Sequence, residues 1–220
     1  IMLVLSSLRC LFFLLSLLSF IVSIPVLASS EAVQHLTRLL GQNQSVEAYF
    51  TQYILDASGS RLQETKGYMV LAQPNRFYWQ TEAPFAQVLV SNGTKMWLYD
   101  QDLEQVMVQP LDPRTTHTPA LLLNGSSRQL DRQFQVYKQD IGRDVVQFIL
   151  QPRPDTESLY QFLRLYFKAD QLQQMQLVDS MEQKTSLYFH QLKTNIAVDS
   201  SIFKFQIPPN VDVIEAIPAI

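Results

Sequence analysis

The chain is poor in cysteine and in net charge, and each scarcity excludes a class of protein. Cys10 is the only cysteine, so no disulfide can form within the chain and stability must come from a packed core. The 17 basic and 20 acidic residues give a formal net charge of -3, without the basic patch or stripe of a nucleic-acid-binding protein. Apolar residues make up 47% of the 220 positions, which is enough for a sizeable core in one domain.

Catalytic and metal-binding patterns are also missing. His35, His117 and His190 are the three histidines, and they lack the spacing of a zinc site. There is no G-x-S-x-G elbow, no P-loop and no dinucleotide-binding glycine pattern. Asp100 and Asp102 form a carboxylate pair, but they fall in a predicted turn, where aspartate is common. We therefore expect no cofactor, no metal and no enzymatic activity. A hydrolase that uses two carboxylates in a cleft is the alternative.

Residues 1–28 have the features of a secretory signal peptide. Arg9 precedes a run from Cys10 to Ser30 that contains no charged residue, and Val-Leu-Ala at positions 26–28 follows its apolar centre. A positive residue, an apolar segment and small residues at the cleavage position together predict export with cleavage after Ala28. The alternative is a retained transmembrane anchor, because the uncharged run is long enough to span a bilayer.

The rest of the chain, residues 29–220, is predicted to form one mainly β domain with small helices. A helix is expected over residues 31–41, where apolar residues recur at helical spacing and Gly41 marks the end. Period-two alternation and turn signals then predict about ten strands in an antiparallel meander. These strands cover residues 45–57, 61–72, 76–82, 85–91, 94–100, 103–109, 133–140, 144–152, 159–167, 172–179 and 184–192. Short helices are expected near residues 119–123 and 126–132, and residues 200–214 suggest a short helix, a short strand and a Pro-Pro break.

Large aromatic residues gather on consecutive strands near a predicted hairpin. Asn92-Gly93 suits the positive φ angles of a type I′ turn between two of these strands. Alternation places Phe77 and Trp79 on one face of their strand, and Trp97 and Tyr99 on one face of theirs. Several strands are apolar on both faces, although an antiparallel sheet normally has one wet face. Either the helices cover one face while aromatics lie at the rim, or a wide sheet curls around an apolar cavity.

Residues 74–106, PNRFYWQTEAPFAQVLVSNGTKMWLYDQDLEQV, closely resemble the periplasmic outer-membrane lipoprotein carrier family. In the family pattern, Pro, Phe and Trp are followed by Pro, Gln and an apolar strand, and then by a turn glycine, an apolar-aromatic strand and Gln-Val. Further resemblance lies in YFTQ at residues 49–52, TPALLLNG at 118–125 and FKFQIPPNVDVI at 203–214. The pattern of residues 74–106 is met by Pro74, Phe77, Trp79, Pro84, Gln87, Gly93, Trp97, Tyr99, Asp100, Gln105 and Val106.

The resemblance implies a half-open antiparallel β-barrel with a helical lid over an apolar cavity. It also implies a monomeric periplasmic carrier that takes acylated lipoproteins from an inner-membrane ABC transporter to an outer-membrane receptor. The alternative within the same fold is a lipid- or glycolipid-binding module or a sensor of envelope stress. The cargo-binding residues that we expect on this basis are Phe50, Phe77, Trp79, Trp97, Tyr99, Leu121, Leu122 and Phe148.

Further expectations concern the mouth of the cavity, its wall and its lid. Phe77 is expected at the mouth, and Trp79 in the cavity wall. At most two of the three leucines at residues 121–123 can face inward from one helix, and Leu121 and Leu122 are expected to fill the empty cavity. Family members usually have an arginine before the Pro of the aromatic strand, which holds the lid to the sheet. Gln73 occupies that position here, so either the lid is held more weakly or Arg76 takes the place of the arginine.

Overall fold

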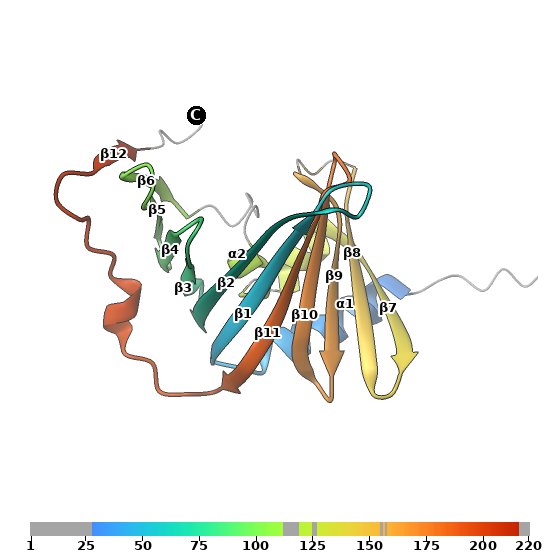
Figure 1. Cartoon of the computed structure of the whole chain (residues 1–220). Coiled ribbons are helices and arrows are strands. Elements are labelled where there is room, and N and C mark those ends of the chain that lie inside the picture. The colour runs from blue at the N-terminus through green and yellow to red at the C-terminus, as the bar shows by residue number, and fades with distance from the viewer. Residues whose placement is uncertain (1–27, 112–118, 125–126, 155, 157, 216–220) are drawn as a thin grey trace, which may run out of the picture.

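A computed structural model describes residues 28–111, 119–124, 127–154, 156 and 158–215 (Figure 1). Twelve strands form one sheet in the order β12-β6-β5-β4-β3-β2-β1-β11-β10-β9-β8-β7. The strands are β1 Ser45–Leu55, β2 Arg61–Ala72, β3 Arg76–Thr81, β4 Gln87–Asn92, β5 Lys95–Asp100, β6 Gln105–Pro110, β7 Phe134–Gly142, β8 Val145–Pro152, β9 Tyr160–Lys168, β10 Gln171–Asp179, β11 Lys184–Thr194 and β12 Asp212–Glu215. The helices are α1 Ala28–Gly41, α2 Pro119–Leu123, α3 Ser127–Gln133 and the 3-10 helix η1 Ser200–Phe203.

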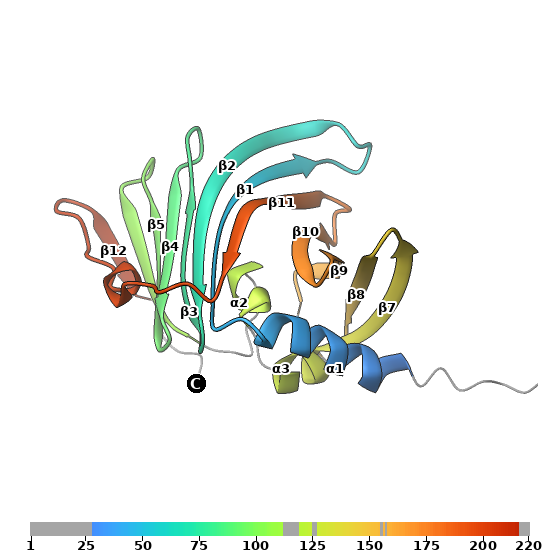
Figure 2. The same ribbon diagram turned by 90° about the horizontal axis from the view of Figure 1, so that it is seen from below.

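The sheet consists of two antiparallel meanders that meet in the middle. Strands β1 to β6 form one meander and β7 to β11 the other, and β1 pairs with β11 so that Phe50 lies opposite Phe189. Figure 2 shows the sheet curling around α1, α2 and α3 without closing. The predicted half-open antiparallel barrel with helices on its concave side is therefore confirmed.

Two local predictions were wrong. The C-terminal strand follows the Pro-Pro break instead of preceding it, and β12 pairs in parallel with β6, with Val213 opposite Val106. The Asn92-Gly93 hairpin is present, but only Gly93 has a positive φ, so the turn is not type I′. The Asn92 side chain instead accepts hydrogen bonds from the backbone N–H groups of Thr94 and Lys95. An Asx turn of this kind needs no positive φ at the asparagine itself.

Helix α1 covers part of the concave side with the apolar face that the sequence predicts. Leu36 and Leu39 are buried, and the helix packs against β7 and α3. Its buried side chains belong to the same hydrophobic core as α2 and the concave faces of the strands. None of the helices in the described residues is long and apolar enough to cross a membrane.

The convex face of β2 to β5 has its own apolar cover. The chain leaves β11 and runs outside the sheet through η1 before reaching β12 (Figure 1). Phe203 of η1 is buried against Val70 and Ala72, and the Arg76 guanidinium lies 5.4 Å from the centre of the Phe203 ring. This cover explains why the strands beneath it are apolar on both faces.

Candidate functional site

One row of apolar side chains crosses the concave face at a single level of the sheet. Antiparallel register places each member opposite the next across β1 to β6. The neighbouring level is more polar on the side of β3 to β6, where it holds Thr81, Gln87, Asp100 and Gln105. The apolar row consists of Ala48, Met69, Trp79, Leu89, Leu98 and Met107.

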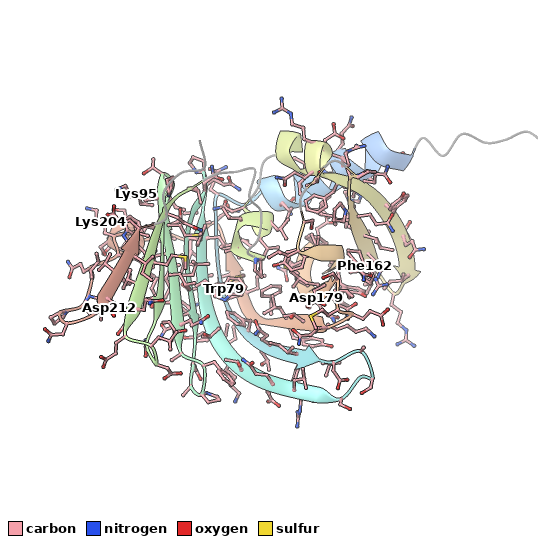
Figure 3. All side chains as sticks on the ribbon, turned by 90° about the horizontal axis from the view of Figure 1, so that it is seen from above. Trp79, Lys95, Phe162, Asp179, Lys204 and Asp212 are labelled. Carbon is pink, nitrogen blue, oxygen red and sulfur yellow. The ribbon has the colours of Figure 1, made fainter. Side chains whose placement is uncertain are left out.

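The rings of Phe50 and Trp79 stack over the middle of this surface. Their centres are 4.4 Å apart and their planes are inclined by 33°. Strand β2 lies between β1 and β3, and Gly67 leaves the space through which the Phe50 ring reaches Trp79. A β-carbon at Gly67 would collide with the Phe50 ring and with the carbonyl oxygen of Gln80. Figure 3 shows Trp79 inside the curve of the sheet.

Helix α2 fills the centre of the concave side. Leu121, Leu122 and Leu123 are all buried, together with Ala120. The expectation that only two of the three leucines face inward is therefore wrong. The reason is that the helix lies inside the curve of the sheet (Figure 2), where all three leucines join the buried core of the concave side.

Two pockets lie at opposite ends of α2. The larger, of about 300 Å³, touches Pro119 and Ala120 at the start of the helix, and the smaller, of about 170 Å³, touches Leu123 at its end. Leu121 and Leu122 line neither pocket. The larger pocket is lined by Gln52, Trp79, Thr81, Gln87, Leu89, Met96, Leu98, Met107, Gln109, Pro119 and Ala120. The smaller is lined by side chains of α1, β1, β2, β9, β10 and β11 with the segments that join them.

Six of the eight predicted cargo-binding residues belong to the buried core of the concave side. These six are Phe50, Phe77, Trp79, Leu121, Leu122 and Phe148. Phe77, which we expected at the mouth, has no exposed surface and is covered by the core. Phe148 lies beneath α1, with the ring of His35 at 5.4 Å and that of Phe167 at 5.7 Å.

Trp97 and Tyr99 lie on the opposite face, so their prediction as cavity residues is wrong. Their rings pack against Phe205 of the C-terminal segment, with centres 6.4 Å and 6.1 Å apart. The neighbours in β5, Met96 and Leu98, face the larger pocket instead. Alternation correctly paired the residues on each face, but it does not say which face is concave.

The attachment of α2 to the sheet also differs from the prediction. Arg76 donates a hydrogen bond of 2.8 Å to the Gln73 carbonyl and points toward Phe203 on the convex side. The Gln73 side chain makes no hydrogen bond to any described part of the helices. The buried Asn124 makes the attachment, because its side-chain amide donates to the Ala72 and Arg76 carbonyls. Sequence reasoning missed Asn124, since Asn-Gly after a helix indicates only a chain reversal.

Two titratable groups adjoin this surface. Burial lowers the pKa of His35, and the positive charges of Lys138 and Arg38 lower it further. The pKa of Asp100 is lowered chiefly by the hydrogen bond that its carboxylate accepts from the Gln87 side chain at 2.8 Å. Within the described residues, no group of His, Cys, Asp and Glu side chains is arranged to hold a metal ion. The site thus offers apolar volume and neutral amides.

Several proteins of known name are similar to this chain in sequence. The model of the family described as "Outer membrane lipoprotein carrier protein LolA" matches residues 41–206. An outer-membrane lipoprotein carrier protein of Pseudomonas aeruginosa (strain PAO1) is 47% identical over 187 residues, which cover 84% of this chain and 88% of the relative. One from Azotobacter vinelandii is 45% identical over 202 residues, or 92% and 96% of the two chains.

A solved structure resembles the fold. It is an uncharacterized conserved protein from Thermus thermophilus, which aligns with a TM-score of 0.53 at 10% identity and covers 86% of this chain and 99% of its own. At that identity the likeness concerns the fold alone.

Proposed function

Because the chain belongs to the outer-membrane lipoprotein carrier family, we propose that it is a periplasmic carrier that shields the acyl chains of lipoproteins from water. Residues 29–220 form the carrier domain in this proposal, and residues 1–28, almost all of which lie outside the described residues, are the signal peptide that directs export. An inner-membrane ABC transporter delivers the cargo, an outer-membrane receptor accepts it, and the carrier acts as a monomer. The carrier itself catalyses no reaction.

The need for a carrier follows from the energetics of acyl chains in water. Each methylene kept from water contributes about 0.8 kcal/mol, so a sixteen-carbon chain contributes about 12 kcal/mol. A lipoprotein with two or three such chains does not leave a membrane unaided at a useful rate. The carrier must therefore supply a comparable apolar surface and still release the cargo at its destination.

The observation that carries the proposal is the buried α2 plug between two pockets. Leu121, Leu122 and Leu123 bury apolar surface worth about 5–9 kcal/mol on the concave face. One long acyl chain offers more than this, so it can replace the helix and join the two pockets into one cavity. When the cargo leaves, the leucines return to the sheet, and this return lowers the free energy of the empty carrier.

The competition between α2 and an acyl chain for the concave face favours a carrier over a sensor or glycolipid-binding module. A carrier needs its empty and loaded states to differ little in free energy, and a plug made from its own side chains provides that balance. Relatives at 42–47% identity are named as outer-membrane lipoprotein carrier proteins, and no feature of the described residues favours the alternative.

Co-expression with a tagged lipoprotein tests the proposal. The exported protein should be recovered from the periplasm in a soluble one-to-one complex, and mass spectrometry should show the cargo with all of its acyl chains. A matched cargo in which the acylated cysteine is replaced by serine should not be retained. Recovery of the unacylated cargo in equal amount would show that the protein recognises the polypeptide and not its lipid.

A further inference from the structure

The larger pocket has polar lining residues that the acyl-carrier function does not by itself require. Trp79, Leu89, Leu98 and Met107 provide its apolar wall. The polar part of the lining comes from four residues with neutral hydrogen-bonding side chains, which are Gln52, Thr81, Gln87 and Gln109. None of the described residues that line this pocket is charged.

Two of these amides have no partner within the described structure. Gln52 and Gln109 line the pocket from β1 and β6, and the side chains of both are half-buried. Neither side-chain amide makes a hydrogen bond to another described residue. Each amide can donate to a carbonyl and accept from an N–H group, so each can satisfy an ester or amide group brought in by a ligand.

Gln87 is held in a fixed orientation. Its amide nitrogen donates to the Asp100 carboxylate at 2.8 Å, while its backbone N–H donates to the Thr81 hydroxyl at 3.1 Å. The Thr81 hydroxyl in turn donates to the Phe85 carbonyl. Since a carboxylate can only accept, the amide oxygen of Gln87 must face away from Asp100, and it remains free as an acceptor.

The charges near this end of the strands are acidic. Asp100 supports Gln87 directly, and Glu82, Asp102 and Glu104 occupy the adjoining turns. Lys66, which is next to Gly67 in β2, is exposed on the convex face opposite Thr51. A phosphate group is normally bound by cations or by several N–H donors, and it would meet the reverse charge here.

We propose that this pocket binds the uncharged, amide- or ester-linked end of an acyl chain, and that it selects such acyl groups over those that end in a phosphate. The chain itself lies along the apolar row, and its carbonyl or N–H group meets Gln87 or Gln52, while Gln109 lies on the other side of the row, opposite Met96. This selection rests on the proposed carrier function. It gives the carrier a means to take an acylated protein and reject the phospholipids that surround it in a membrane.

Binding of three twelve-carbon ligands below their micelle concentrations tests the selection. The ligands are 1-lauroylglycerol, N-lauroylglycinamide and dodecyl phosphate, each measured by displacement of the neutral dye Nile red. We expect the two neutral ligands to bind at least about tenfold more tightly than dodecyl phosphate at low ionic strength. The difference should shrink in salt, because the repulsion is screened.

Charge variants at Gln52 identify the pocket. Gln52→Lys should strengthen binding of dodecyl phosphate by about tenfold and leave 1-lauroylglycerol within about threefold of the parent. Gln52→Glu should weaken the binding of dodecyl phosphate below that of the parent protein. Gln173→Lys places the same charge at an exposed position on β10 and should change neither affinity. Gln87→Lys repeats the test at a more exposed position, and circular dichroism confirms the fold of each variant.

Two results would overturn the proposal in different ways. If dodecyl phosphate binds as tightly as the neutral ligands and Gln52→Lys has no effect, the selection is absent while acyl binding stands. If none of the three ligands binds, the proposed carrier function fails together with the selection.

Discussion

The side-chain amide of Asn124 donates a hydrogen bond of 3.0 Å to the backbone carbonyl of Arg76. A second bond, of 3.3 Å, runs from the same amide to the carbonyl of Ala72. The backbone N–H of Asn124 closes the turn of α2 onto Ala120. Asn124 therefore joins the end of the plug helix to the strands on either side of the β2–β3 turn.

Replacing Asn124 by alanine should loosen the plug. The change leaves the buried Ala72 carbonyl and the partly buried Arg76 carbonyl without this partner and should lower the free energy of unfolding by about 1–3 kcal/mol. Hydrogen exchange should become faster in α2, and bis-ANS should bind more strongly, because the concave face opens more often. Thermal denaturation and dye titration measure the two effects.

Arg76→Ala and Gln73→Ala are the controls for this prediction. Both residues lie at the same turn, but the Arg76 guanidinium faces Phe203 on the convex side. Neither change should increase dye binding. If Arg76→Ala raises it as much as Asn124→Ala does, then the arginine holds the helix and Asn124 is not the attachment.

Gly67→Ala should disrupt the stacked pair on the concave surface. The new methyl group would collide with the Phe50 ring and the Gln80 carbonyl, and such overpacking costs about 1–3 kcal/mol. We expect a lower melting temperature and altered Trp79 fluorescence as Phe50 moves away. Gly41→Ala is the matched control, since its methyl group would meet nothing within 4 Å. Equal effects of the two substitutions would show that the contact with Phe50 does not matter.

Phe205→Ala should expose Trp97 without changing the cavity. The Phe205 ring covers Trp97 and Tyr99 on the convex face, and loss of these contacts should cost about 1 kcal/mol. In a Trp79→Phe background, the remaining tryptophan emission should shift to longer wavelength while binding of 1-lauroylglycerol stays the same. Phe85→Ala, at an exposed position, should leave the emission unchanged. A loss of lauroylglycerol binding in Phe205→Ala alone would place Trp97 in the cavity after all.

The sequence predicted nearly every strand because most turns are local and have clear signals. Alternation ending at Pro, Gly or Asn located β1 to β11 to within a few residues. β12 was misplaced because its position depends on a long-range parallel pairing with β6, which no local pattern reveals. The side assigned to Trp97 was wrong for a related reason. With the C-terminal segment covering the convex face, both faces of β5 are apolar, and composition cannot distinguish them.

The site was predicted in composition better than in geometry. Six of the eight predicted cargo-binding residues lie in the buried core of the concave side, whereas Trp97 and Tyr99 lie on the convex face. The burial of Phe77 and of all three leucines depends on how the helix sits inside the curl, which is a tertiary property. Asn124 carries no special signal in the sequence, since a polar residue after a helix is common and only its burial shows what it does.

Stability should fall as the pH is lowered through the range of histidine. Burial against Phe148 lowers the pKa of His35 below its ordinary value of 6.5, so the unfolded chain takes up a proton before the folded one does. The free energy of unfolding is therefore highest above pH 6.5, decreases as the pH falls toward the lowered pKa, and levels off below it. The charged groups around the ring are Lys138 and Arg38, which lower its pKa, and Asp170 and Asp140, which raise it.

Urea denaturation between about pH 5 and 8 measures this dependence. His35→Gln should remove the part of the slope that His35 contributes, so that the parent and the variant converge at low pH. Parallel curves for the two proteins across this range would mean that His35 titrates alike in the folded and unfolded chains.

The central claim is that α2 gives up its place on the concave face when an acyl chain enters. Hydrogen exchange of the amides of Ala120 to Asn124, measured with and without saturating 1-lauroylglycerol, tests this most directly. Bound ligand should speed exchange in α2 by about tenfold or more and slow it in β3 to β5, because the chain takes over the contacts of the helix. If α2 is protected as well or better with the ligand bound, the helix is a fixed part of the core and the displaceable plug is contradicted.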